Sequence, residues 1–268
     1  NEKVANLSGC IQDAQRLLNY IEANLNQEKY ELNAKTLFTG SEILPTRQNI
    51  IENIKTHLGQ ATKGDLILLF YAGHGSKEKA PANFREADGN FQTLVPCDAR
   101  NLNATGGTIR NILDKELRFL LHQLWEKEQP EIVFIQDSCH STGASRSSEQ
   151  LNVVLDELRG LEQELQEENA QERTFESPQP RFTEPTEVEK RGDLWSNSTT
   201  DELLATYTGL QEAPEWLAKV LASSNESDVS FDLPMAEHIH LAACDKHQFA
   251  YEIPLKGGVF TSNLLDIL

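Results

Sequence analysis

Cysteine is scarce in this sequence, and no two cysteines lie close together. The chain of 268 residues has four cysteines, none of them in a C-x-x-C pair. A chain of this length does not need a disulfide framework, and such wide spacing indicates neither disulfides nor a standard zinc site. We therefore expect free thiols, as in a reducing cytoplasm, and no structural metal. The cysteines are Cys10, Cys97, Cys139 and Cys244.

Positive charge and long apolar runs are also scarce. Lys and Arg number 24 against 42 Asp and Glu, which gives a formal net charge of −18. This charge disfavours binding to nucleic acid or an anionic membrane, and it would attract a basic peptide. No apolar run approaches the roughly 18–20 residues that a membrane span requires. No charged-then-apolar leader opens the chain, so we expect no secretory signal.

The sequence does contain an alternation of helical and strand patterns. Apolar residues at helical spacing predict helices, one of them beginning after Thr46 as N-cap. Continuous apolar runs between them predict strands buried on both faces of a parallel sheet. The fold class is therefore α/β, with a mainly parallel sheet sandwiched by helices. The other helices are predicted over residues 8–25 and 113–125, and the strands over residues 66–71, 132–135 and 239–243.

Residues 145–235 interrupt this alternation. Residues 149–171 are strongly acidic and helix-prone, and residues 195–222 regain some helical character. Residues 173–192 are rich in Pro, Glu and Thr and lack apolar periodicity, which favours a mobile loop. We divide the chain into a first part of the core (1–144), an acidic helical insertion and linker (145–235), and the last core strand and helix (236–268).

Two predicted strands each end in a reactive side chain. The first strand is followed by Gly73-His74-Gly75 and the second by Asp137-Ser138-Cys139. Because the carboxyl ends of parallel strands meet at one edge of a sheet, both side chains should lie there. A thiol beside an imidazole is a nucleophile with its base, and a nearby protonated histidine raises the thiolate fraction. The sequence therefore predicts Cys139 as nucleophile and His74 as general acid/base.

These two segments resemble motifs of a known family. Residues 70–76 and 137–141 resemble the histidine and cysteine motifs of caspase-like cysteine peptidases of the metacaspase and orthocaspase type, in peptidase family C14. Residues 6–14, 93–98 and 257–261 resemble three further segments of that family. The resemblance covers about residues 4–140 and 238–268. It implies the caspase-hemoglobinase α/β/α fold, with the insertion placed before the last core strand.

The resemblance also implies a catalytic apparatus. Cys139 would attack the scissile carbonyl, and His74 would protonate the leaving amine. The backbone N–H groups of Gly75 and Cys139 would form the oxyanion hole. The resemblance therefore implies a cysteine endopeptidase acting on polypeptides, in a regulated stress, cell-death or defence pathway.

A substrate pocket for a basic P1 residue is implied in the same way. Asp13 and Asp137 match the acidic positions of the family's S1 pocket, with Cys10 nearby. Ala72 stands where many metacaspases have a serine. Two carboxylates suit the guanidinium of Arg or the ammonium of Lys, and they would repel an acidic P1 residue. We therefore expect cleavage after Arg or Lys.

Regulation and the cofactor are less determined. Many metacaspases need Ca²⁺, but the acidic residues here form no dense ligand run, so we expect no cofactor and leave calcium activation open. An activating ligand or partner protein stays unidentified. The scattered acidic candidates are Glu86, Asp88 and Asp114. The insertion is either an autoprocessing or autoinhibitory segment or a plain solvated linker; its basic residues, at which the enzyme could cut itself, are Arg173, Arg181, Lys190 and Arg191.

Two alternative functions stay open. The domain could be a signal-receiving or scaffold module that keeps the caspase-like fold and acts by binding partners. It could also be a different thiol hydrolase, acting on a small amide or ester. The intact pair of Cys139 and His74 argues against the first, and the two pocket carboxylates argue against the second.

Overall fold

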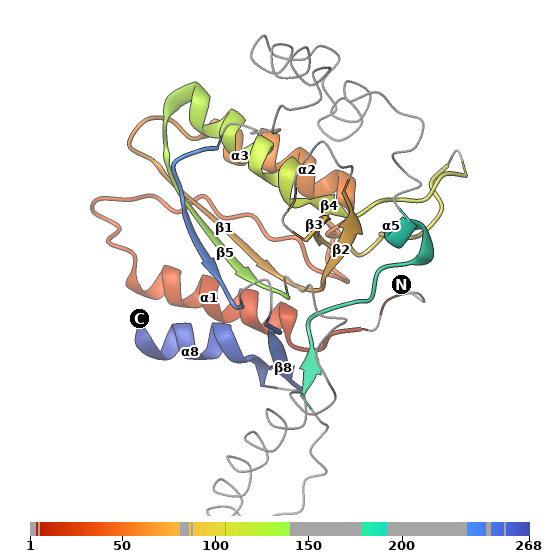
Figure 1. Ribbon diagram of the computed structural model, residues 1–268. Helices are drawn as coiled ribbons and strands as arrows, with labels where there is room; N and C mark the ends of the chain where they lie inside the picture. The colour runs from red at the N-terminus through yellow and green to blue at the C-terminus, as the bar shows by residue number, and fades with distance from the viewer. Residues whose placement is uncertain are drawn as a thin grey trace, which may run out of the picture.

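A parallel sheet in the order β1-β5-β7 forms the centre of the molecule (Figure 1). Its strands are β1 (Leu66–Ala72), β5 (Glu131–Asp137) and β7 (Ile239–Ala242). In this computed structural model, the residues described are 4, 6–80, 86, 88–104, 106–139, 178–191, 235–244, 248–254 and 256–268. The caspase-like α/β class predicted from the sequence is confirmed.

Helices cover both faces of the sheet (Figure 1). On one face lie α2 (Arg47–Thr56) and α3 (Asp114–Glu128); on the other lie α1 (Cys10–Asn24) and α8 (Val259–Ile267). The predicted N-cap of α2 is confirmed, because the side chain of Thr46 accepts a hydrogen bond from the Asn49 amide at 3.2 Å. A 3₁₀ turn, η1 (Leu58–Gln60), follows α2.

Two small antiparallel sheets flank the central one. The first joins β2 (Gly75–Lys79), β3 (Asn90–Leu94) and β4 (Ile112–Leu113). The second joins β6 (Gln179–Pro180), β8 (Tyr251–Ile253) and β9 (Gly257–Gly258). A short helix, α5 (Glu187–Arg191), lies against β2. Among the described helices, none is both long and apolar enough to cross a membrane.

The main core lies between the sheet and the α2–α3 layer. Its buried members come from both layers and include Ile54, Ile67, Leu120, Ile132 and Phe134. The apolar runs that predicted strands and the helical spacing that predicted α2 and α3 therefore supply the same core. Burying such side chains removes apolar surface from water and is the main stabilising contribution to the fold.

Two predictions about burial and order were wrong. The strands β1 and β7 are not buried on both faces, and Ile239 is 60% exposed. The reason is position in the sheet: among the described strands of the central sheet, only β5 has a neighbouring strand on each side. The mobile loop or linker predicted over 173–192 is also wrong for residues 179–180 and 187–191, which form β6 and α5. The helical stretches predicted over 149–171 and 195–222 lie outside the described residues, and the three-part division of the chain stays a prediction.

Candidate active site

The register of the central sheet brings His74 and Cys139 to one edge. Strands β1 and β5 pair in parallel, with Ala72 opposite Asp137. His74 and Cys139 each follow that pair by two residues, so both leave the sheet at its carboxyl end. Both are buried, with Cys139 fully enclosed. The expected meeting of the two strand ends is therefore observed.

The backbones of Gly75 and Cys139 lie against each other. A Cβ atom on residue 75 would overlap the carbonyl oxygen of Cys139, so only glycine allows this approach. The amides of both residues donate hydrogen bonds to one acceptor, the carbonyl oxygen of Arg181, at 2.9 Å from Gly75 and 3.1 Å from Cys139. Two amides that converge on one oxygen in this way have the arrangement that the predicted oxyanion hole requires.

The thiol of Cys139 lies in an apolar enclosure. Its Sγ donates to the carbonyl oxygen of Ala250 at 3.3 Å and accepts from the Ala250 amide at 3.1 Å. Cys244 belongs to the same buried cluster. Burial raises the pKa of the Cys139 thiol well above its usual range, and the neighbouring Cys244 thiol raises it further. A thiol must lose its proton before it can act as a nucleophile, and this environment disfavours that loss.

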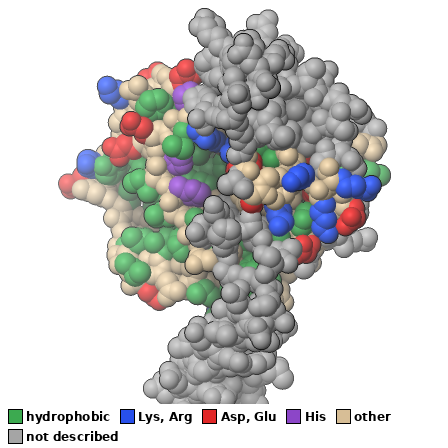
Figure 2. Space-filling model, viewed as in Figure 1, with side chains coloured by type: hydrophobic (Ala, Val, Ile, Leu, Met, Phe, Trp, Pro, Cys, Tyr) green, Lys and Arg blue, Asp and Glu red, His purple; other side chains and the backbone are tan. Residues whose placement is uncertain are grey.

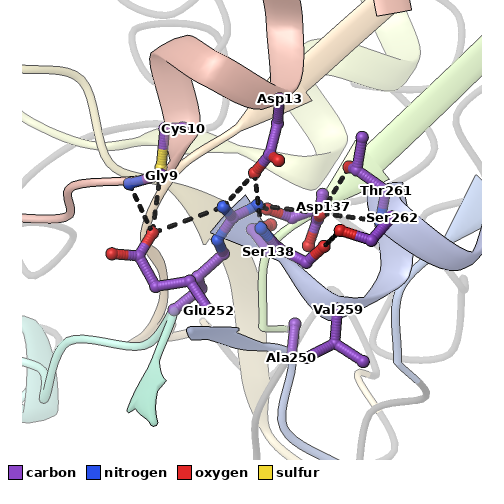
Figure 3. A network of polar contacts seen from close by, with 12 residues as sticks. Gly9, Cys10, Asp13, Asp137, Ser138, Ala250, Glu252, Val259, Thr261 and Ser262 are labelled. Carbon is purple, nitrogen blue, oxygen red and sulfur yellow. Dashed lines mark hydrogen bonds and ion pairs between the residues drawn. The ribbon is translucent and has the colours of Figure 1, made fainter. Parts of the chain in front are cut away.

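A buried arginine fills the predicted S1 pocket. The guanidinium of Arg181 is fully buried and is paired with three carboxylates, of Asp13, Asp137 and Glu252. Its Nη1 lies 2.8 Å from Asp137 Oδ2 and its Nη2 lies 3.3 Å from Glu252 Oε2. Figure 3 shows these three carboxylates converging from α1, the end of β5 and β8. Buried charges are tolerated only with partners, and here the Arg181 guanidinium is a partner of all three carboxylates.

Further hydrogen bonds fix the orientation of the pocket carboxylates. Asp137 Oδ2 accepts from the Thr261 hydroxyl at 2.5 Å and from its amide at 3.2 Å (Figure 3). Asp13 Oδ2 accepts from the Gly258 amide at 2.8 Å. Burial raises the pKa of Asp137, while the charge of Arg181 acts in the opposite direction. Gly258 and Thr261, where the chain turns into α8, therefore hold the pocket carboxylates in place.

The other two predicted pocket residues lie at its margin. Cys10 Sγ is 3.8 Å from Glu252 Oε2, and burial raises the pKa of this thiol to about 12. Ala72 lies beside Asp137 in the sheet. Sequence reasoning missed Glu252. The signal available was a single charged residue within the otherwise apolar stretch of residues 249–254.

The segment that carries Arg181 pairs with main-chain groups on both sides of that residue. Strand β6 pairs antiparallel with β8, and the Arg181 amide donates to the Ala250 carbonyl oxygen at 2.9 Å. Beyond Arg181, the amide of Thr183 donates to the carbonyl oxygen of Gly75 at 3.0 Å. Main-chain pairing of an extended peptide to a strand edge is a common mode of peptide recognition.

The acidic residues considered for calcium contact protein groups. Glu86 and Asp114 both pair with Lys115, at 2.7 and 3.5 Å. Asp88 Oδ1 accepts from the Asn90 amide at 3.1 Å. Burial raises the pKa of Asp114 to about 6. Within the described ranges, no group of three or more His, Cys, Asp or Glu side chains is arranged to hold a metal ion.

An α/β/α sheet with a cysteine and a histidine at adjoining strand ends is the arrangement of caspase-like cysteine peptidases. Residues 1–146, more than half of the 268, match the family model described as the metacaspase, peptidase C14 domain. The chain therefore belongs to the metacaspase family of cysteine peptidases, which are hydrolases, and the predicted family is confirmed.

Individual relatives agree with this membership. The chain is 31% identical over 144 residues to Metacaspase-3 of Trypanosoma cruzi, and this alignment covers 51% of this chain and 36% of the relative. It is 30% identical over 141 residues to Metacaspase-6 of Arabidopsis thaliana, and this alignment covers 52% of this chain and 34% of the relative. The match thus spans about a third of the length of these relatives. Protein GSU0716 from Geobacter sulfurreducens, a solved structure, shares the fold, with a TM-score of 0.52, 18% identity, and coverage of 98% of this chain and 73% of that one.

Proposed function

We propose that this protein is a cysteine endopeptidase that hydrolyses peptide bonds after Arg or Lys. The observation that carries the proposal is the buried guanidinium of Arg181 between Asp13 and Asp137, the two acidic residues named from the sequence. Arg181 contacts all three carboxylates, and Arg16 pairs with the other oxygen of Asp13, so the carboxylates exceed the two guanidiniums by one charge. They therefore favour a cation and repel an acidic P1 side chain.

The proposed mechanism assigns one step to each group at the strand ends. His74 takes the proton of the Cys139 thiol, and the thiolate attacks the P1 carbonyl carbon. The amides of Gly75 and Cys139 stabilise the oxyanion; their hydrogen bonds to the Arg181 carbonyl oxygen support this role. His74 then protonates the leaving amine, and water hydrolyses the acyl-enzyme to release the new carboxyl terminus.

The occupant of the pocket suggests a self-cleavage site. Arg181 places its side chain among the S1 carboxylates and its carbonyl oxygen at the two amides, as a substrate P1 residue would. We therefore place self-cleavage between Arg181 and Phe182. Of the other basic candidates, Lys190 and Arg191 lie in α5, and Arg173 lies outside the described residues.

Cellular setting and activation belong to the same proposal. All four cysteines are free, which supports work in a reducing compartment such as the cytoplasm. A site filled by its own chain needs a trigger, and this supports a regulated role in stress, cell death or defence. We propose that the chemistry itself needs no metal, and that calcium, if it acts, acts on activation.

A panel of fluorogenic peptides varied only at P1 tests the function. The uncut and the processed protein are assayed with and without Ca²⁺, with Cys139→Ala as the control. We expect turnover of Arg and Lys peptides, none of Asp peptides, and none by the control. Preference for Asp would overturn the pocket assignment. Absence of turnover under every condition would favour the scaffold alternative.

A further inference from the structure

We propose that Arg100 and Glu189 form a latch that holds residues 182–191 on the core and keeps Arg181 in the pocket. The proposal rests on the proposed function only in taking this pocket as the substrate site. The latch lies on the other side of the Arg181–Phe182 bond from β6. It is made of residues that take no part in the catalytic chemistry described above.

Glu189 is the part of the latch carried by the segment. Its side chain is buried, and its Oε2 lies 3.0 Å from Arg100 Nη2. Its Oε1 accepts from the Asn111 side-chain amide at 3.0 Å, and Asn111 is itself fully buried. The Glu189 carboxylate also accepts from the Thr186 amide at 2.6 Å, while the Thr186 hydroxyl accepts from the Glu189 amide at 3.3 Å. This capping box fixes the start of α5 and with it the position of the carboxylate.

Arg100 is the part of the latch carried by the core. It is 4% exposed and has a φ of 67°, a left-handed conformation that is uncommon for a non-glycine residue. Its Nη1 donates to Thr183 Oγ1 at 3.1 Å, and its Nη2 donates to the Glu184 carbonyl oxygen at 2.9 Å. One guanidinium therefore holds the segment at two residues besides Glu189, as a planar, multivalent donor can.

Ser76 connects the latch to the oxyanion amides. Its fully buried hydroxyl donates to the Thr183 carbonyl oxygen at 2.7 Å and accepts from Arg100 Nη2 at 3.3 Å. Ser76 directly follows Gly75, whose amide and carbonyl both bond the segment. The chain is thus held continuously from Arg181 to Glu184, and the scissile bond lies inside the held stretch.

A cut between Arg181 and Phe182 would separate the pocket occupant from the latch. Before the cut, the latch keeps Arg181 at a high effective concentration beside the pocket, so an outside peptide must compete with it. After the cut, Phe182 and the residues that follow stay latched, while Arg181 keeps its contacts with the pocket, β8 and the two strand-end amides but has lost its covalent link to the latch. The latch therefore closes the site in the intact chain, and self-cleavage removes its effect.

Protection of Arg181 from trypsin measures the latch without any activity of this protein. In a Cys139→Ala background, the appearance of a fragment beginning at Phe182 is followed by mass spectrometry for Arg100→Met, Glu189→Gln and Thr183→Val. We expect slow cutting in the parent and at least about tenfold faster cutting in the Arg100 and Glu189 variants. Glu187→Gln is the matched control, because Glu187 lies on the same helix but is exposed and pairs with the exposed Lys190; its rate should equal the parent's.

The outcomes separate the latch from the proposed function and from misfolding. Parent-like protection in folded Arg100→Met and Glu189→Gln would overturn the latch, whatever the P1 panel shows. A latch without P1-Arg turnover would overturn the proposed function alone. If removing one charged partner unfolds the protein, Thr183→Val decides, because it removes only the hydrogen bond from Arg100 to the hydroxyl of this half-buried residue. Faster cutting of this variant supports the latch, and an unchanged rate overturns it.

Discussion

The backbone amide of Cys139 donates a hydrogen bond of 3.1 Å to the carbonyl oxygen of Arg181. The nucleophile's own amide thus holds the carbonyl of the residue whose side chain fills the pocket. Arg181 thus contacts the pocket carboxylates through its side chain and the two strand-end amides through its carbonyl oxygen. This relationship makes the proposed activity open to direct test.

Arg181→Gln should abolish self-cleavage at residue 181. Glutamine has no charge to offset the three pocket carboxylates, so the segment would no longer be seated. Intact-mass measurement of the active protein over time should show the fragment beginning at Phe182 for the parent only. Arg191→Gln is the matched control and should cut normally. Continued cutting at residue 181 in Arg181→Gln would refute the assignment.

Asp137→Asn should lower kcat/KM for arginyl peptides by about 10- to 100-fold, because it removes a charge-assisted hydrogen bond in a buried site. The side-chain oxygen of the asparagine can still accept the hydrogen bonds from Thr261, so the pocket should keep its shape. The exposed Asp65→Asn carries the same change of charge and should leave kcat/KM unaltered. An equal loss in both variants would mean that net charge, not the pocket, governs the rate.

Glu252→Gln should have a smaller effect, about three- to tenfold on kcat/KM, because its contact with the guanidinium is longer, at 3.3 Å. The carboxylate also accepts from the amides of Ser8 and Gly9, at 2.7 and 3.2 Å. Its loss should therefore also lower the melting temperature. A variant with parental kinetics would show that Glu252 only anchors the start of α1.

The thiol of Cys139 should resist alkylation near neutral pH while the site is closed. Its folded pKa lies above its ordinary value, so the thiol stays protonated through pH 7–9 and ionises only at higher pH. Iodoacetamide labelling of the uncut His74→Ala variant, followed by mass spectrometry, should rise only above that range. The urea-unfolded protein should label with an ordinary midpoint of about 8.5. A folded midpoint below 8 would contradict this environment.

Leu120→Ala should destabilise the fold by about 2–5 kcal/mol, since it leaves a cavity in the main core. Leu120 is 1% exposed and lies on α3 facing the sheet. Urea unfolding measures the change. Leu102→Ala, at a residue that is 69% exposed, serves as control and should change stability little. Similar losses in both variants would contradict the placement of the core.

Local pattern predicted much of the site. The apolar runs predicted β1 and β5, and the residues after them supplied His74 and Cys139. Asp13 and Asp137 came from the resemblance and do contact a guanidinium. Glu252 and the latch were not predicted. A single charge in an apolar stretch marks Glu252 as unusual but does not show that it meets Asp13, which lies 239 positions away along the chain. Docking of residues 178–191 was missed because long-range contacts, not local periodicity, order that segment.

The sequence alone placed a thiol and an imidazole after two apolar strands, and this follows from residue type and strand period, which are local properties. The carboxylates suited to a basic side chain came from the resemblance to a known family. Only the tertiary structure decided which basic residue fills the pocket, and that Arg100 and Glu189 hold the segment beyond it. Those choices depend on contacts between distant parts of the chain, where burial makes each unpaired charge costly and so selects one arrangement.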